Sequence, residues 1–328
     1  MRVFPEWARA LSLDAQIKGI DLPLHAPDDM YRDVALYIKN DPLSLGALVT
    51  THKLDMFRAC RDIFDYADPY AERLGEVSSL SKRGSVFRAH AKDPVSSGRS
   101  LAEFVPDGFW AEHGGEVLVL GAGGSALAMS LYLSQADSGR GAQPRYSDVI
   151  DANRTISDYT GIAASPQNNI GSSLSRVSGH GDAPRRITIA NRSAPRLETA
   201  KIALAGLNTG TEFRFVHGPS PVDNDRLISN LPPYSLIVNA TGLGKDAPGS
   251  PTTDAVDYPE SSLVWEINYR GDLIFMRQAR AQAARKHLRV EDGWRYFIHG
   301  WTQVIEEVFN IEIDNARLGE LSEIAARV

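Results

Sequence analysis

The sequence predicts an α/β protein made of two α/β domains, the second of which is built on a doubly wound parallel sheet. Three observations lead to this expectation. A strand, a glycine-rich turn and a helix follow one another without a break at residues 116–133. From there on, short apolar strands alternate with helical segments, the pattern of a parallel sheet covered by helices. The length of 328 residues also exceeds that of one ordinary domain.

The glycine-rich turn has the pattern of a Rossmann-type dinucleotide site. Gly121 permits a sharp turn, Gly123 lets the backbone approach a pyrophosphate, and the small Ala126 lets helix and strand pack closely. The helix then offers N–H groups and the positive end of its dipole to phosphates. The alternative is a tight strand–helix connection without a ligand. The residues expected to contact the dinucleotide here are Gly121, Ala122, Gly123, Gly124 and Ser125.

Composition narrows the function classes. The net charge of −6 disfavours non-specific binding to nucleic acid or to an anionic membrane surface. A single cysteine, Cys60, allows neither an intrachain disulfide nor a thiolate metal site, so a reducing cytoplasm and no metal are expected. The opening residues lack the apolar core of a signal peptide. Residues 117–136 are uncharged and long enough to span a membrane, but the glycine cluster divides them, so no membrane partner is expected.

The first domain is expected to cover residues 1–103. The apolar run at 45–51, which leads into His52 and Lys53, has the composition of a buried parallel strand. A β-hairpin is expected around Gly84. Helices are expected at 7–13, 29–40 and 54–75, the last of them disturbed at Pro69.

The second domain is expected to cover residues 104–275. Within it, residues 137–184 are rich in Ser, Gly, Asn and Asp and have little periodicity, which predicts an insertion or a mobile loop. Residues 276–328 are expected to form two helices that pack back on the first domain and close the cleft. The further elements expected are strands at 186–190, 213–218, 235–242 and 262–269 and a helix at 194–206.

Two polar residues of the first domain are candidates for acid–base chemistry. Lys53 follows the expected strand at its carboxyl end, where open α/β sheets bind their ligands. A lysine there can donate a hydrogen bond to a substrate hydroxyl or exchange a proton with it. The plainer interpretation is a solvent-facing lysine. Asp93 lies in a segment expected to be a loop, where an aspartate is usually a turn former or a helix cap.

The chain resembles the shikimate/quinate dehydrogenase family along its whole length. The family has N-V-T-x-P-H-K, G-A-V-N-T, N-T-D, G-A-G-G, N-R-T-x-x-R, I-N-A-T-x-x-G and D-x-V-Y motifs in this order. Their counterparts here are ALVTTHK ending at Lys53, GEVSS from Gly75, AKD ending at Asp93, GAGGSA from Gly121, NRSAPR from Asn191, VNATGLG from Val238 and EINY ending at Tyr269.

The resemblance implies an enzyme that moves hydride between NADP(H) and a secondary alcohol of a hydroxylated ring acid such as shikimate or quinate, in aromatic amino acid biosynthesis. Lys53 and Asp93 would form its proton-relay pair, because a carboxylate beside an ammonium favours both charged forms. The enzyme would be a monomer or a homodimer. The resemblance implies substrate contacts at Thr50, Ser78, Tyr269 and Gln303, and cofactor contacts at Asn239, Ala240 and Thr241.

Arginines after the expected second strand favour NADP over NAD. That strand usually ends in Asp or Glu when the ribose 2′-hydroxyl is bound. Here it leads into Asn191, Arg192 and Ser193, with Arg196 close behind, and arginine forks bind a 2′-phosphate bidentately. The alternative is that these arginines make only surface contacts. A second alternative places the strand before Asp151, which would favour NAD.

The substrate half matches the family less well. Ser78 replaces one family asparagine and Ala91 another, and the late family glutamine falls near Gly300, with Gln303 one turn on. The family's opening strand and its carboxylate-binding S-x-S motif have no counterpart after Met1, so we expect either an internal start or another way of binding the carboxylate. The open alternatives are a divergent NAD(P)-dependent reductase of another polyol or an amino-sugar-like acid, and a non-catalytic NADP-binding regulator.

Overall fold

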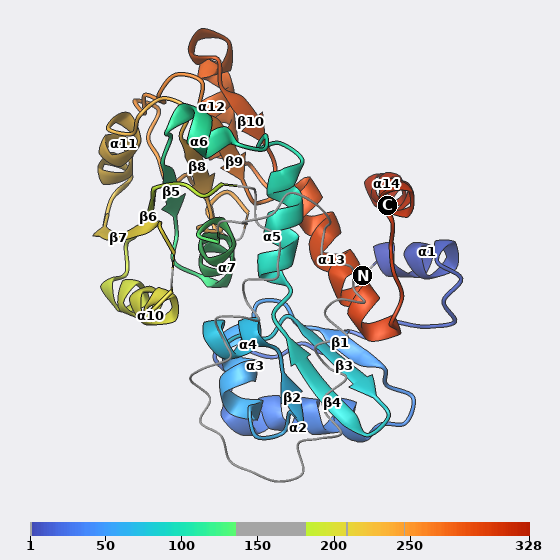
Figure 1. The fold of residues 1–328 in the computed structure, drawn as a ribbon. Helices are drawn as coiled ribbons and strands as arrows, with labels where there is room; N and C mark the ends of the chain where they lie inside the picture. Colours follow the sequence, from blue (N-terminus) through green and yellow to red (C-terminus); the bar gives the residue numbers. More distant parts are fainter. Residues whose placement is uncertain (1, 136–181, 208, 246) are drawn as a thin grey trace. The chain divides into compact units, whose positions relative to one another are not determined.

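A computed structural model describes residues 2–135, 182–207, 209–245 and 247–328 (Figure 1). The chain divides into two compact units. The first unit comprises residues 1–92 and 297–328, and the second unit comprises residues 93–296. The expected insertion at 137–184 and the alternative strand before Asp151 lie outside the described residues, apart from residues 182–184. Among the described residues, no helix has both the length and the apolarity that crossing a bilayer requires.

The second unit is built on a six-stranded, wholly parallel sheet. Its order is β10-β9-β8-β5-β6-β7. From β5 the chain adds β6 and β7 on one side, and it then returns to the other side of β5 to add β8, β9 and β10. This confirms the predicted doubly wound fold, whose ligand crevice lies where the order reverses. The strands are β5 (Val117–Leu120), β6 (Arg186–Asn191), β7 (Glu212–His217), β8 (Leu236–Asn239), β9 (Leu263–Glu266) and β10 (Arg289–Glu291).

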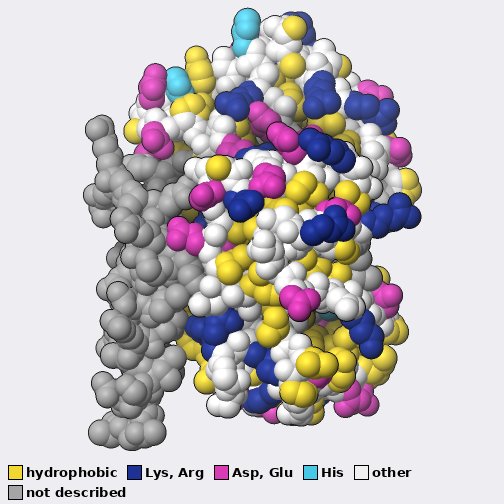
Figure 2. Space-filling model, turned by 90° about the vertical axis from the view of Figure 1, so that its right-hand side faces the viewer, with side chains coloured by type: hydrophobic (Ala, Val, Ile, Leu, Met, Phe, Trp, Pro, Cys, Tyr) yellow, Lys and Arg dark blue, Asp and Glu magenta, His cyan; other side chains and the backbone are white. Residues whose placement is uncertain are grey.

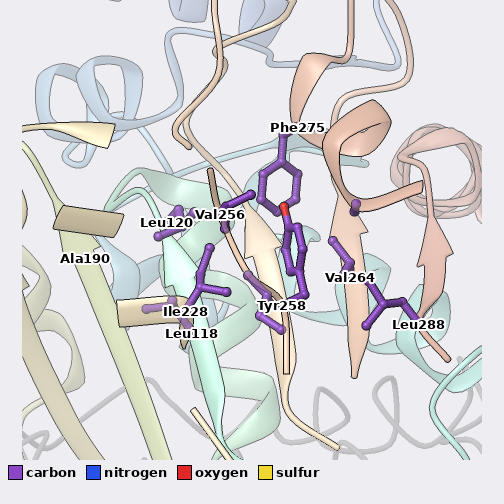
Figure 3. Close-up of a cluster of buried hydrophobic side chains, with 11 residues drawn as sticks. Leu118, Leu120, Ala190, Ile228, Val256, Tyr258, Val264, Phe275 and Leu288 are labelled. Carbon is purple, nitrogen blue, oxygen red and sulfur yellow. The ribbon is translucent and has the colours of Figure 1, made fainter. Parts of the chain in front are cut away.

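Helices cover this sheet and enclose an apolar core. Leu118 of β5 and Val264 of β9 lie in the same buried cluster as Phe275 and Tyr258 (Figure 3). The last two rings meet edge to face at 6.1 Å between centroids, a favourable aromatic geometry. The helices described in this unit are α5 (Asp93–Ala102), α6 (Phe109–His113), α7 (Gly124–Leu133), α10 (Ala194–Leu204), α11 (Pro221–Ser229) and α12 (Ile274–Lys286).

The first unit has a four-stranded mixed sheet in the order β1-β3-β4-β2. The C-terminal helix α14 belongs to it, because the indole of Trp7 in α1 donates to the carbonyl of Leu321 at 2.7 Å. The elements are α1 (Val3–Ala10), α2 (Asp28–Asn40), β1 (Gly46–Leu48), α3 (Lys53–Cys60), β2 (Tyr66–Ala67), α4 (Pro69–Leu74), β3 (Ser79–Arg83), β4 (Val86–His90), α13 (Trp294–Phe309, in this unit from residue 297) and α14 (Asn315–Arg327).

Two local expectations for this unit were wrong, and one was right. The run at 45–51 forms no buried parallel strand, since β1 is an edge strand that pairs antiparallel with β3 and is only half-buried. The single helix expected at 54–75 is two helices separated by β2. Asp68 caps the second by accepting from the Ala71 N–H at 2.6 Å, with Pro69 in its first turn. The hairpin of β3 and β4 turns at Gly84, at φ +59°, as expected.

The division between units also differs from the expected boundaries at residues 103 and 276. Helix α5 belongs to the second unit because it packs on α7. Helix α12 likewise packs on β9 and β10 of its own sheet rather than returning to the first unit.

On the face shown in Figure 2, basic and acidic side chains are interspersed over the described residues.

Candidate functional site

The turn after β5 requires glycine for two reasons. Gly121 has φ +117°, and a Cβ built on it would lie 2.5 Å from the carbonyl oxygen of Ala240. The Gly121 N–H donates to Ala190 and the Ala240 N–H donates to Leu120, each at 2.8 Å, so the ends of β5, β6 and β8 are joined. Ala126 is fully buried beneath the turn. The backbone of the turn is therefore held rigidly at the point where the strand order reverses.

Helix α7 begins at this turn with its first N–H groups uncapped. Gly123 is the N-cap residue and supplies no side chain to accept from these groups. A Cβ built on Gly123 would meet only the Arg196 guanidinium, at 4.0 Å. The helix end therefore faces open space with a cation beside it, an arrangement suited to a phosphate.

A pocket of about 480 Å³ lies at the carboxyl ends of β5, β6, β7 and β8. It brings together most of the residues predicted for the cofactor, from three separate segments of the chain. Those that line it are Gly121, Ala122, Gly123, Asn191, Arg192, Ser193, Arg196, Ala240 and Thr241. Residues that we did not predict also line it, namely Leu120, Ala190, Gly218, Pro219, Ser220, Pro221, Asn224, Leu243, Ser250 and Pro251.

The segment after β7 was the main omission. Its strand was predicted, and the carboxyl ends of parallel strands meet at one edge of a sheet, so residues after His217 were also candidates. Ser220 begins α11 with a capping box: its hydroxyl and the Asp223 carboxylate satisfy each other's backbone N–H groups. In contrast, Ser193 begins α10 without any side-chain cap. The N-termini of α7 and α10 at this pocket are thus open to anions, whereas the N-terminus of α11 is already capped by the Asp223 carboxylate.

Three of the predicted cofactor residues do not line the pocket. Gly124 and Ser125 form the first turn of α7. Asn239 is fully buried at the end of β8, where its Oδ1 accepts from the N–H and hydroxyl of Thr241 at 3.1 and 2.7 Å. Its amide donates to the Glu266 carboxylate at 2.7 Å. The Asn239 side chain therefore shapes the pocket wall by holding Thr241.

Glu266, which the sequence did not single out, links the ends of β8 and β9. Its other carboxylate oxygen accepts from the backbone N–H and the amide of Asn268, at 3.0 and 2.7 Å. Burial raises the pKa of the Glu266 carboxyl to about 7, against the opposing effect of these donors. The D-x-V-Y motif has an aspartate at this position. An acid fits here because its two carboxylate oxygens accept hydrogen bonds from Asn239 and Asn268.

Replacing this acid should change how stability depends on pH. Because the folded-state pKa of Glu266 is raised, its contribution to stability is full below the ordinary value of 4.5 and is lost as the pH rises through about 7. Denaturant unfolding of the wild type and of Glu266→Gln, measured from pH 5 to 8, should therefore show the wild type losing up to about 3 kcal/mol relative to the variant.

The control for that prediction is Glu323→Gln, because the Glu323 side chain is 73% exposed and its partner Arg327 keeps its charge over this pH range. The stability difference between this variant and the wild type should not vary over the same pH range. A difference between wild type and Glu266→Gln that is also constant with pH would contradict the buried, shifted carboxyl.

Three of the site residues predicted in the first unit lie at neighbouring positions of its backbone. Lys53 is the first residue of α3, and its carbonyl accepts from the Val77 N–H at 3.2 Å. Thr50 follows β1, whose neighbour Val49 donates to the carbonyl of Ser78 at 2.9 Å. The backbone around Lys53, Thr50 and Ser78 is thus tied together by direct hydrogen bonds.

The hydroxyl of Ser78 serves the protein's own backbone. It accepts from the Lys92 N–H at 2.6 Å and donates to the His90 carbonyl at 3.3 Å. Gln303, on the buried side of α13, donates its amide to the Glu306 carboxylate. Both residues predicted to replace family amides therefore already have partners inside the first unit.

A buried charge cluster that we did not predict lies beside Ser78. Glu307 of α13 is 3% exposed, and its carboxylate lies 2.7 Å from the Lys92 ammonium and accepts from the Ser81 hydroxyl at 3.0 Å. The His90 ring has one nitrogen 3.1 Å from Glu307 and the other 3.3 Å from Asp68. Burial acts to raise the pKa of Glu307, but the charge of Lys92 and the neighbouring His90 outweigh it and hold this pKa well below its usual range.

Asp93 and Tyr269 belong to the second unit. Asp93 was expected in a loop but is the first residue of α5, and it is 6% exposed. Tyr269 follows β9, with the Arg270 guanidinium 5.9 Å from its ring centroid. The two candidates for the proton relay, Lys53 and Asp93, therefore come from different units.

Among the comparisons with known proteins, only the one with solved structures finds similar proteins. No family model and no curated protein matches the sequence. The shikimate 5-dehydrogenase of Thermus thermophilus in complex with NADP(H) and shikimate is 20% identical, with a TM-score of 0.59 over 99% of this chain and 92% of that chain. The shikimate 5-dehydrogenase of Listeria monocytogenes in complex with shikimate and NAD is 17% identical, with a TM-score of 0.65 over 99% and 90%.

A third similar structure has another activity in its name. The 5-ketofructose reductase of a Gluconobacter strain is 16% identical, with a TM-score of 0.58 over 98% of this chain and 91% of that chain. At these identities the likeness establishes the fold. The chain has the two-domain α/β fold of the shikimate dehydrogenases.

Proposed function

We propose that this protein is an NADP-dependent dehydrogenase that transfers hydride between the nicotinamide and a secondary alcohol of a hydroxylated ring acid, as in the reduction of 3-dehydroshikimate. The pocket at the strand reversal carries this proposal. It combines a rigid glycine turn, the uncapped start of α7 and two arginines at a single site. The similar structures bound to shikimate with NADP(H) or NAD support the same reaction type.

The pocket favours the phosphorylated cofactor. Among its described lining residues, none is Asp or Glu, whereas Arg192 and Arg196 both contribute. An acidic residue would be needed to select the 2′-hydroxyl of NAD. The pyrophosphate would be bound at the start of α7, the 2′-phosphate by Arg192, Arg196 and the uncapped start of α10, and the uncharged adenine toward Ser220.

When bound, the cofactor supplies the redox chemistry, and the protein supplies orientation and a proton path. Lys53 and Asp93 would hold the alcohol oxygen between them and take its proton as hydride leaves the carbon. Their charges would also stabilise the alkoxide-like charge that develops on this oxygen.

The test is NADP+ reduction followed by nicotinamide absorbance, with shikimate and quinate as substrates and NAD+ as the competing cofactor. Turnover of a ring acid with preference for NADP+ would support the proposal. NADP+ binding without oxidation of any ring or open-chain polyol acid would contradict the dehydrogenase function and leave the non-catalytic regulator.

A divergent substrate is the second candidate, and one observation favours it. Ser78 and Gln303, which would replace two family amides, are both engaged by partners within the first unit. A ring acid would then lack two of its expected contacts, whereas nine of the twelve predicted cofactor residues line the pocket. The 5-ketofructose reductase among the similar structures fits a reductase of another polyol. Rates with open-chain keto sugars and amino-sugar-like acids beside shikimate distinguish the two candidates.

Arg196→Ala should weaken NADP+ binding about 10- to 150-fold, because hydrogen bonds to a charged group contribute about 1.5–3 kcal/mol. NAD+, which lacks the 2′-phosphate, should be affected less than about threefold. Titration of both cofactors measures this. Arg214→Ala is the matched control, since Arg214 lies on β7, is 57% exposed and pairs with Glu212. Equal losses for NADP+ and NAD+ would remove Arg196 from recognition of the 2′-phosphate.

A further inference from the structure

Helix α5 carries Asp93 at its first position and is buried along most of its length. Asp93, Ser97 and Leu101 are all buried, and the Ser100 hydroxyl is used within the helix, donating to the carbonyl of Ser96 at 2.8 Å. The helix packs on α7, which begins at the glycine turn of the cofactor pocket. Figure 1 shows the two helices side by side in the second unit. One helix therefore starts at the candidate proton acceptor and the other at the candidate dinucleotide site.

The two helices meet at a glycine and an aromatic ring. A Cβ added at Gly98 would overlap the ring of Tyr132, with the Cδ2 atom of that ring only 2.6 Å away. Tyr132 is 5% exposed, and every residue of α7 from Ala126 to Leu133 is buried. Because the ring and the helix below it are both buried, a side chain at position 98 would have to displace the ring from its packed position. The absence of a side chain at Gly98 thus sets how closely α5 approaches α7.

The far end of α5 is fixed as well. Glu103, just after the helix, forms a bidentate ion pair with Arg295 at 2.5 and 2.8 Å. The next residue, Phe104, meets Trp265 of β9 edge to face, with 5.4 Å between centroids. The end of the helix is therefore anchored by Arg295 and Trp265, and its middle is fitted to Tyr132.

We propose that the contact between Gly98 and the Tyr132 ring is a positioning device that couples Asp93 to the dinucleotide turn, so that cofactor binding orders both. Gly98 lies about 7.5 Å along α5 from Asp93, and Tyr132 lies about 12 Å along α7 from the turn, at a rise of 1.5 Å per residue. A displacement at the contact is therefore transmitted to Asp93 within one and a half turns of rigid helix. A shift of about 1 Å at a reacting group can cost about 100-fold in rate.

This inference rests on the proposed function and adds a positioning residue to it. It also assigns Asp93 to the cofactor side of the enzyme, whereas Lys53 belongs to the other unit. Binding of NADP+ should therefore stabilise α5 as well as α7, even though α5 contributes no residue to the lining of the pocket.

Hydrogen exchange with and without NADP+ tests the coupling without any need for turnover. In the wild type, amides of both 93–102 and 124–133 should exchange more slowly when NADP+ is bound. In Gly98→Ala, the α7 peptide should keep this response, while the α5 peptide should lose most of it, at least about fivefold in rate. In the same variant, the Kd for NADP+ should stay within about threefold of the wild-type value. The rate at which it oxidises a substrate with NADP+ should fall about 10- to 100-fold.

Gly319→Ala is the matched control. Gly319 lies in α14, and a Cβ added there would meet nothing within 4 Å. This variant should keep the wild-type exchange response and gain up to about 1 kcal/mol in stability from the higher helix propensity of alanine. Where Gly98→Ala fails to fold, Gly98→Ala combined with Tyr132→Leu removes the overlap and should restore folding but not the response of α5 to NADP+.

Two results would overturn the coupling: a wild-type α5 that ignores NADP+ while α7 responds, and a Gly98→Ala variant in which α5 still responds. A wild-type chain that binds no NADP+ in a titration contradicts the proposed function itself, and that result is obtained before any variant is made. A chain that binds NADP+ but turns over no substrate still reports on the coupling through exchange.

Discussion

Lys53→Ala is expected to lower kcat/KM about 30- to 5,000-fold, because removal of a proton donor or of a cation at a developing alkoxide costs roughly 2–5 kcal/mol of transition-state stabilisation. The expectation follows from the position of Lys53 at the start of α3, beside Thr50 and Ser78. Steady-state rates with the best ring-acid substrate measure it.

Binding of NADP+ separates this effect from misfolding. The described residues that line the cofactor pocket all belong to the second unit, and Lys53 belongs to the first. The Kd for NADP+ should therefore stay within about threefold of wild type. Lys201→Ala, at a half-exposed lysine on α10 that pairs with Glu198, is the control and should keep full activity. A Lys53→Ala variant with more than about a tenth of wild-type activity, a loss below ~1.4 kcal/mol, would remove Lys53 from the mechanism.

Glu307→Gln is expected to lower the free energy of unfolding by about 3–5 kcal/mol, because it leaves the charges that face a buried carboxylate without compensation. Those charges are the Lys92 ammonium at 2.7 Å and the Arg83 guanidinium at 3.7 Å, and the His90 ring also lies 3.1 Å from the carboxylate. The glutamine would keep the size of the side chain while losing its charge. Denaturant unfolding at neutral pH gives the size of the loss.

The pH dependence of that loss has a definite sign. The folded-state pKa of Glu307 is lowered, so its contribution is full above the ordinary glutamate value of 4.5 and is lost as the pH falls below it. The difference in the free energy of unfolding between the wild type and Glu307→Gln should therefore become smaller at acidic pH. Glu323→Gln, at a side chain 73% exposed and 3.2 Å from Arg327, should cost less than about 1 kcal/mol. Equal losses for the two variants would show that the cluster contributes nothing beyond a surface pair.

Combining Glu307→Gln with Lys92→Met tests whether the cost comes from the orphaned cation. The double variant should recover part of the loss, since the uncompensated charge is removed together with its partner. Additive losses would assign the effect of Glu307 to its other neighbours, Ser81, His90 and Arg83, instead.

The sequence by itself determined the elements whose physics is local. A turn that needs φ +117° at Gly121 and a bare backbone at Gly123 can be recognised from neighbouring residues, as can the apolar strands around it. Arg192 and Arg196 follow one strand within six residues, so their place at the pocket edge could also be predicted. The doubly wound sheet followed from alternation of such strands with helices.

Only the tertiary structure decided which distant residues meet. The apolar run at β1 predicts a strand with at least one buried face. That this strand pairs antiparallel with β3 depends on the tertiary structure. Glu266 joins Asn239 and Asn268 only because β8 and β9 are neighbours in the sheet. Three-residue β10 has too few side chains to be recognised by periodicity.

The same reason applies to charge and packing across the chain. His90 and Glu307 are separated by more than two hundred residues, and nothing near either one indicates the other. Gly98 looks like a helix-weakening residue in the sequence until the ring of Tyr132 is found against it. Local patterns specify the elements and the glycine turn here, whereas pairings between elements depend on long-range packing that no short window of sequence contains.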